Sequence, residues 1–215
     1  MGYVCLVGAT TPLSVLDLIP RSSGDSTVTA VRNVIDLAQQ AERFGCQRYW
    51  FAEHHLNPGV LGASPAVSIS LVAGATSTIR IGSAGVQLGH RQPLATVEES
   101  GLLDAAYPGR LDLGLGRSFG RQKEKPEAEA AAAAYAVRGG TGSHTVEQRA
   151  GNGLLLPKQY DVTKLLATSR TKVAALLDLL QQPGAYTPDY ESQVSDILAL
   201  LAGTYVSPGG VAVHA

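Results

Sequence analysis

The feature that most constrains the fold is a repeat of short apolar runs and amphipathic stretches in the first half of the chain. The apolar runs are expected to be β-strands near residues 13–19, 48–53, 79–87 and 110–116. The stretches between them are expected to be helices. Strands that alternate with helices at intervals of about 30 residues predict a parallel sheet with crossover connections.

Start and stop signals bound these helices. The first is expected from Thr27 to Phe44, because Ser26 or Asp25 is suited to cap it and Gly45 to end it. Prolines at the first helical position favour two more, one from Pro65 to Ala73 and one that runs from Pro93 to the Tyr-Pro-Gly of residues 107–109.

The amino-acid composition changes after Arg117. Residues 120–153 are poor in large apolar residues and rich in Ala, Glu and Gly, which predicts a short helix at 127–138 followed by a linker. Further helices are expected at 162–182 and 189–202, and a fifth strand could begin within 210–215. We therefore expect one domain over 1–215, with a core at 13–118, an insertion at about 119–160 and a helical segment at 161–215.

Composition excludes some classes of partner. The net charge is -1 and charged residues make up 16% of the chain, so no basic field would attract nucleic acid or an anionic membrane. Cys5 and Cys46 are far apart in the sequence with no paired spacing, which favours a reducing compartment over a disulfide framework or a zinc knuckle. The first 20 residues lack a positive start and are interrupted by Pro12 and Asp17, so we expect no secretory signal and a cytoplasmic location.

Functional groups of parallel α/β sheets lie beyond the carboxyl ends of the strands. Three stretches fall there: Glu53-His54-His55, the "AGVQLGHRQP" of 84–93 and the "GLGRSFG" of 114–120. The two histidines are either acid-base groups or polar loop residues. A metal site is not expected, because adjacent histidines point in different directions and no further ligand set is visible.

The glycines near these strand ends also leave two interpretations open. "GLGRSFG" fits neither a dinucleotide fingerprint nor a P-loop, so its arginine either contacts a phosphate or is solvated at a tight turn. Glycine and alanine within "GSAGV" of 82–86 indicate a close approach of a ligand or of backbone. A flat ring system would suit such a surface.

The segments "LSVLDL", "AERFGCQRYWFAEHH" and "TSTIRIGSAGVQLGHRQPLATVEESGLLDAAYPGRLDLGLGRS" together resemble the bacterial-luciferase-like flavin monooxygenase family. The resemblance covers Leu13 to Ser118. It implies a (β/α)8 TIM-barrel-type fold with parallel strands and an insertion after strand four. Four or five strands cannot close such a barrel, so we expect it to be incomplete at its C-terminal side, as in a truncated or shortened relative, or completed by a partner chain.

The resemblance also implies roles for individual residues. His54 would handle protons at the flavin and Glu53 would lie beside the flavin ring, with His55 mostly orienting the loop. Glu53 or a backbone carbonyl is the expected partner of the His54 ring. Ala84 and Gly85 would form a non-proline cis peptide under the ring.

The strand-four end completes the implied cofactor site. Arg117 would contact the flavin phosphate, with Ser118 next to it in the cofactor site. In luciferase proper a reactive cysteine precedes this arginine, and Gly116 replaces it here.

The activity implied by the resemblance is oxygenation of a small organic substrate by reduced FMN and O2. A separate NAD(P)H-dependent flavin reductase would supply the reduced flavin, and a homo-oligomer is expected. The alternatives left open are hydride transfer with the deazaflavin F420, and a non-catalytic chain that only binds flavin or is a fragment.

Overall fold

The computed structural model describes residues 11–118, 120–121, 147–149, 151–156 and 174–213. The chain divides into two compact units. The first comprises residues 1–120 and 187–215, and the second comprises residues 121–186. The expected helix at 127–138, most of the one at 162–182, and Cys5 lie outside the described residues.

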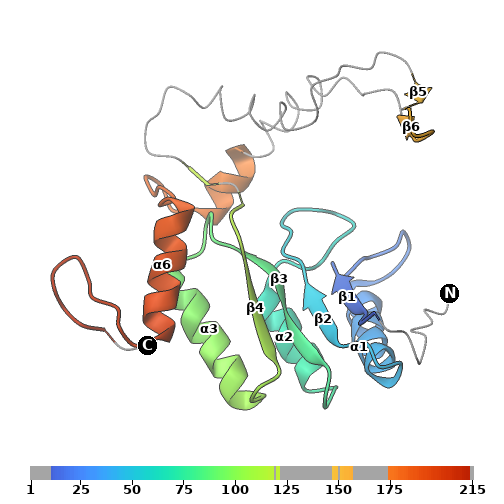
Figure 1. Ribbon diagram of the computed structural model, residues 1–215, viewed down its shortest axis with the longest axis horizontal. Helices are drawn as coiled ribbons and strands as arrows, with labels where there is room; N and C mark the ends of the chain where they lie inside the picture. The colour runs from blue at the N-terminus through green and yellow to red at the C-terminus, as the bar shows by residue number, and fades with distance from the viewer. Residues whose placement is uncertain (1–10, 119, 122–146, 150, 157–173, 214–215) are drawn as a thin grey trace. The chain divides into compact units, whose positions relative to one another are not determined.

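The first unit is built on a four-stranded parallel sheet with the order β1-β2-β3-β4 (Figure 1). The strands agree with the predicted ones to within two residues, and they are β1 (Ser14–Asp17), β2 (Arg48–Phe51), β3 (Arg80–Gln87) and β4 (Leu111–Gly116). Each strand therefore pairs with the next strand along the chain, as in consecutive units of a (β/α)8 barrel.

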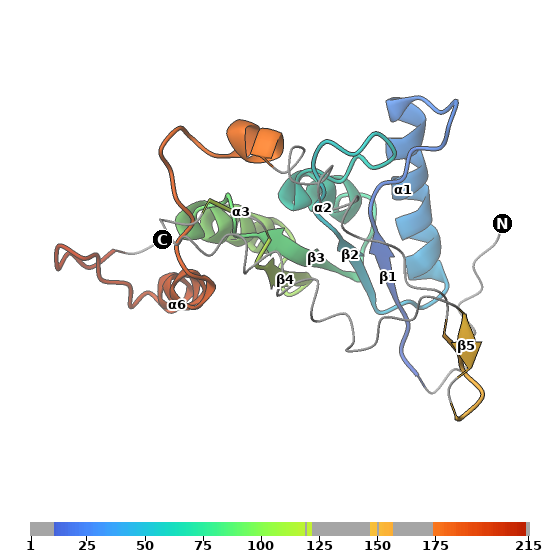
Figure 2. The same cartoon turned by 90° about the horizontal axis from the view of Figure 1, so that it is seen from above.

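Helices connect the strands and cover one face of the sheet (Figure 2). They are α1 (Thr27–Arg43), α2 (Pro65–Ala73), α3 (Pro93–Ala106) and α6 (Tyr190–Leu201). The predicted start signals are confirmed: the Ser26 side chain accepts a hydrogen bond from the Thr29 N–H, and Pro65 and Pro93 occupy the first turns of their helices. None of the helices in the described part of the chain is both long enough and apolar enough to span a membrane.

The core lies between the sheet and these helices. Neighbouring strands align Val15, Tyr49, Ile81 and Leu111 in one row, and Tyr49 and Ile81 are fully buried against the helices. Side chains alternate along a strand, so the next row, which contains Leu16, Trp50, Gly82 and Asp112, faces the other side. We call this second side the inner face.

Helix α6 completes the fourth strand-helix unit. It lies beside α3 (Figure 1), and its Ile197 is buried with Val86, Leu88 and Val97. Gln193, whose amide donates to the Leu88 carbonyl at 2.7 Å, is buried, whereas Leu198 is 61% exposed. The buried face of α6 therefore contains Gln193 and Ile197 and excludes Leu198.

The possible fifth strand at 210–215 is not present among the described residues. The chain instead reverses at Ser207–Gly210, where the Gly210 N–H donates to the Ser207 carbonyl at 2.8 Å. Val206 and Ala212 then form a single antiparallel bridge. Proline and two glycines in succession favour this turn over a continuing strand.

The second unit contains a small antiparallel ladder within the segment expected to be a linker. Its strands are β5 (Gln148–Arg149) and β6 (Leu155–Leu156), joined by a turn that includes Gly153 at a φ of 83°. Residues 174–180 are helical, in agreement with the end of the helix expected at 162–182.

Candidate functional site

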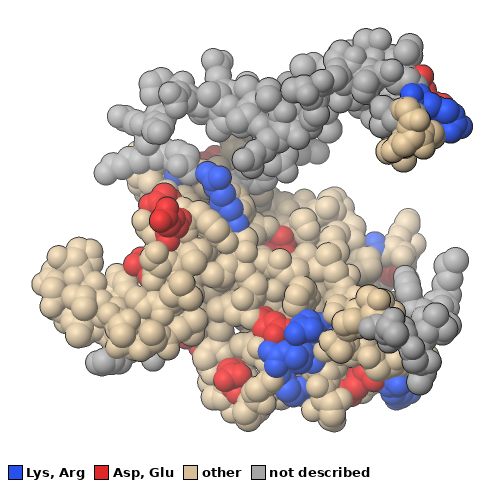
Figure 3. Space-filling view, in the orientation of Figure 1, with Lys and Arg blue, Asp and Glu red and all other residues tan. Residues whose placement is uncertain are grey.

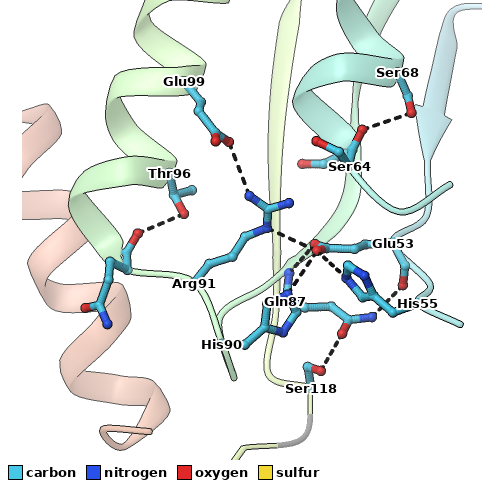
Figure 4. Close-up of polar contacts among 12 residues, drawn as sticks. Glu53, His55, Ser64, Ser68, Gln87, His90, Arg91, Thr96, Glu99 and Ser118 are labelled. Atoms are coloured by element: carbon cyan, nitrogen blue, oxygen red, sulfur yellow. Dashed lines mark hydrogen bonds and ion pairs between the residues drawn. The ribbon is translucent and has the colours of Figure 1, made fainter. Parts of the chain in front are cut away.

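A buried carboxylate joins the carboxyl ends of β2 and β3 (Figure 4). The Glu53 side chain is 0% exposed. Its Oε1 atom lies 2.9 Å from His55 Nε2, 3.2 Å from His90 Nε2 and 3.0 Å from Arg91 Nε. Its Oε2 atom accepts the backbone N–H of Gln87 at 2.8 Å. We call these five residues the Glu53 network.

The network keeps Glu53 ionised. Burial alone would raise the pKa of this carboxyl group. Hydrogen bonds from His90, the Gln87 N–H and His55, together with the charge of Arg91, more than offset that effect and lower the pKa from 4.5 to about 2. Glu53 is therefore a fixed anion that holds two loops together, and it is not a proton donor near neutral pH.

Glu53, His55 and His90 also offer metal ligands, because their donor atoms all lie within 4.8 Å of one another. The sequence did not indicate this set, since His90 was not singled out. The Arg91 guanidinium already lies 3.0 Å from the same carboxylate oxygen. A divalent cation bound there would be repelled by that positive charge, so the arrangement favours an ion-pair network over a metal site.

His54 and His55 occupy different environments. The His55 ring lies against Glu53 and makes an edge-to-face contact with the His90 ring at 4.9 Å. The His54 side chain is exposed, and its backbone N–H donates to the Gly62 carbonyl at 2.8 Å. Glu53 or a backbone carbonyl was expected to partner the His54 ring. Glu53 is instead bonded to His55, two residues along the chain.

The loop that carries His54 is fixed to the end of β1. The Leu61 N–H donates to the Ile19 carbonyl at 3.0 Å, and the Gly62 N–H donates to the Leu18 carbonyl. A Cβ atom on Gly62 would lie 2.9 Å from the Leu18 oxygen, so no side chain fits there without movement. The exposed His54 ring is thus presented by a loop that is held at both ends.

The small residues of β3 and β4 are explained in part by contact between the strands. A Cβ atom on Gly82 would lie 2.1 Å from the Asp112 carbonyl oxygen, and one on Gly114 would lie 2.2 Å from the Ser83 carbonyl oxygen. Close approach of backbone therefore accounts for these two glycines. A Cβ atom on Gly85 would lie at an ordinary 3.5 Å from the Gly116 backbone, and Ala84 is exposed.

The predicted cis peptide between Ala84 and Gly85 is wrong, because no peptide bond among the described residues is cis. The register between β3 and β4 instead shifts between Ser83 and Val86, as in a β-bulge. The bulge changes the direction of the strand at Ala84–Gly85 with trans peptides alone.

The inner face of the sheet bears an open pocket of about 570 Å³. Asp112 lies at its edge, where its carboxylate accepts hydrogen bonds from Arg48 at 3.2 Å, from Trp50 at 3.0 Å and from Arg80. Figure 3 shows charged side chains gathered toward one end of this face and an uncharged surface beyond them. Burial raises the pKa of Asp112, but the bonds from Arg80 and Trp50 and the two arginine charges lower it overall.

The end of β4 carries Arg117 and Ser118, both exposed. Within the described ranges, the Arg117 guanidinium has no hydrogen-bond or ion-pair partner. The Ser118 hydroxyl donates to Gln87 Oε1 at 2.6 Å (Figure 4), so the end of β4 is connected to the Glu53 network. Reasoning from sequence marked the stretch that contains Gln87, His90 and Arg91 but assigned no role to these residues. The His-Arg pair just after a strand was the available signal.

Comparison with protein families gives a match that includes all four strands of the parallel sheet. The family model described as luciferase-like monooxygenase matches residues 11–138. The chain belongs to this family. The matched range contains the Glu53 network, Arg117 and Ser118.

Individual relatives agree with this assignment. The chain is 46% identical over 108 residues to the uncharacterised protein YceB of Bacillus subtilis, which is 50% of this chain and 33% of that protein. It is 45% identical over 111 residues to a protein of Escherichia coli named luciferase-like monooxygenase, which is 52% of this chain and 33% of that protein. The aligned part of the chain thus spans about a third of the length of these curated relatives.

A crystal structure of apo-MsnO8 also resembles the chain. It is 29% identical, the match covers 78% of this chain and 42% of that one, and the TM-score is 0.49.

Proposed function

We propose that this chain forms the flavin-binding part of a monooxygenase that uses reduced FMN and O2 to oxygenate a small organic substrate. The observation that carries the proposal is the arrangement at the carboxyl edge of the sheet. Arg117, an exposed arginine that has no partner among the described residues, lies at the end of β4. His54, an exposed histidine on an anchored loop, lies at the end of β2. Family membership supports the choice of cofactor.

The residues between these two side chains suit a flat ring. Ala84 and Gly85 follow the bulge of β3 and present almost no side chain, and Gly116 does the same on β4. Small residues beside an unpaired guanidinium match the two parts of FMN, an aromatic ring system and a phosphate. The donor set therefore fits this cofactor.

Each residue then has a defined task. Arg117 would hold the phosphate, with Ser118 next to it in the cofactor site. Ala84 and Gly85 would support the ring, and Glu53 would hold the loops in place. Reduced FMN, when bound, supplies the electrons that oxygen activation requires. His54 moves a proton at the reacting edge, for which an exposed and uncommitted imidazole on a fixed loop is suited.

The proposal includes the partners expected from the sequence. A separate reductase supplies reduced flavin, because no nicotinamide fingerprint is present. The protein acts in the cytoplasm as a homo-oligomer and binds neither nucleic acid nor membrane. Among the described residues, β1 and β4 form the two edges of the sheet, and a second copy of the chain would pair with one of these edges.

Titration of the purified chain with FMN and with F420 tests the cofactor assignment. We expect quenching of flavin fluorescence with saturable binding of FMN. Tighter binding of F420 than of FMN would replace oxygenation with hydride transfer. Failure to bind either cofactor at high micromolar concentration would reject both and favour a chain without flavin chemistry.

Substitution of the two adjacent histidines tests the catalytic assignment. We expect His54→Ala to lower oxygenase turnover about 100-fold, the usual size of an acid-base contribution. Its melting temperature should stay within a few degrees, because the side chain is exposed. His55→Ala should lower the melting temperature more, since it removes a partner of buried Glu53. Equal effects of the two substitutions on turnover would contradict the assignment.

A further inference from the structure

Gln87 connects the ends of three strands through its own hydrogen bonds. Its backbone N–H donates to Glu53 Oε2 at 2.8 Å, and its side-chain amide donates to the Glu53 backbone carbonyl. Its Oε1 atom accepts the Ser118 hydroxyl at 2.6 Å. One residue at the end of β3 thus fixes the positions of the residues that follow β2 and β4 (Figure 4).

The Ser118 backbone has a conformation that needs support. Its φ is 54°, in the left-handed region that residues other than glycine seldom adopt. Ser118 is exposed, so core packing does not impose this conformation. The hydrogen bond to Gln87 is its only side-chain hydrogen bond in the described part of the chain.

The turn at Ser118 determines how the chain leaves β4, and Arg117 is the residue immediately before it. The Arg117 guanidinium has no partner among the described residues, so the position of the Arg117 backbone decides where this side chain can reach. We propose that Gln87 is a positioning residue that, through Ser118, holds Arg117 where it selects a phosphorylated flavin over an unphosphorylated one. This inference rests on the proposed flavin site and adds a determinant of specificity to it.

Binding of FMN and of riboflavin separates the phosphate contact from the rest of the site, because the two ligands differ only in the phosphate. We expect the wild-type chain to prefer FMN, and Arg117→Met to remove most of that preference. Gln87→Leu should reduce the ratio of the two affinities about tenfold, the effect of about one hydrogen bond. Riboflavin affinity should change little.

Three further variants keep the result interpretable. Ser118→Ala removes the same hydrogen bond from an exposed position, so it should fold normally, and the double variant should lose no more preference than either single one. Gln39→Leu is the matched control, since the Gln39 amide donates to the Ala75 carbonyl at 2.9 Å, within the α1–α2 region. It should leave the ratio unchanged.

The outcomes separate a failure of the proposed role of Gln87 from a failure of the proposed flavin site. An unchanged ratio in both Gln87→Leu and Ser118→Ala, with a reduced ratio in Arg117→Met, overturns the role of Gln87 alone. An unchanged ratio in Arg117→Met overturns the phosphate contact and with it the inference. A wild-type chain that binds neither ligand overturns the proposed function as well.

Discussion

Two carboxylates of this chain each form ion pairs with arginine, but they differ in burial. Glu53, at the carboxyl end of the sheet, is 0% exposed and is bonded to two histidines and to Arg91. Asp112, on the inner face, is 19% exposed and is bonded to Arg48 and Arg80. Both carboxylates have an arginine partner, and they differ in burial and in the two histidines that contact Glu53 alone.

The difference in burial predicts which of the two networks fixes the local geometry and which tolerates substitution. Water screens the Asp112 pairs, because the arginine side chains are themselves more than a third exposed. Glu53 has no access to water, so each missing partner leaves an uncompensated part of a buried charge. The Glu53 network should therefore set the geometry of the candidate site, whereas the Asp112 network should tolerate change.

The largest expected effect is that of Arg91→Met. It removes the cation from the buried Glu53 and should lower the free energy of unfolding by about 3 kcal/mol or more. Urea unfolding followed by circular dichroism measures this loss. A loss below about 1 kcal/mol would contradict the expected difference between the two networks, because a solvent-screened pair such as those of Asp112 contributes that little.

The second-largest expected effect is that of acid on the stability contributed by Glu53. The pKa of Glu53 is lowered in the folded state from 4.5 to about 2. A depressed carboxyl pKa contributes stability that is complete above pH 4.5 and is lost as the pH falls toward 2, here about 3 kcal/mol. Unfolding free energies of wild type and Glu53→Gln, measured from pH 5 to 2, should converge as the pH falls. Parallel curves would contradict the pKa assignment.

Glu42 separates the effect of hydrogen bonds from the effect of cations. Its Oε1 atom accepts the backbone N–H groups of Ser77, Thr78 and Ile79, and it has no cationic partner within the part of the chain that the structure describes. Burial raises its pKa, but these bonds lower it overall to about 2. Glu42→Gln should cost about 1–2 kcal/mol, and added salt should leave that cost unchanged. A cost that falls with salt would indicate a charge partner.

The smallest expected effect is that of Arg48→Met on the inner face. This substitution leaves Asp112 with Arg80 and Trp50, so the free energy of unfolding should fall by less than about 1 kcal/mol. It is the matched control for Arg91→Met, since both replace an arginine Nε bond to a carboxylate. A loss equal to that of Arg91→Met would show that burial does not separate the two networks.

Local patterns were sufficient to predict most of the fold. The four strands and α1, α2 and α3 lie where the apolar runs, the Ser26 cap, and Pro65 and Pro93 indicated. The chain reversal at 207–210 was missed because the apolar run after it resembles a strand.

The candidate site was predicted only in outline. Three stretches at strand ends were identified correctly as neighbours, because parallel strands bring their carboxyl ends to one edge. The backbone at Ala84–Gly85 was predicted to be cis, but a bulge relative to β4 provides the turn instead. Sequence spacing carries no information about a register shift between two strands.

What the sequence determined by itself is the order of strands and helices, the positions of their ends and the edge at which polar side chains gather. These depend on periodicity and capping within about 20 residues of chain. Only the tertiary structure decided that Glu53 binds His55, His90 and Arg91 and leaves His54 exposed. His90 and Arg91 lie 37 and 38 residues from Glu53 along the chain. Their meeting depends on the packing of β2 against β3, because a buried charge selects whichever donors that packing brings within reach.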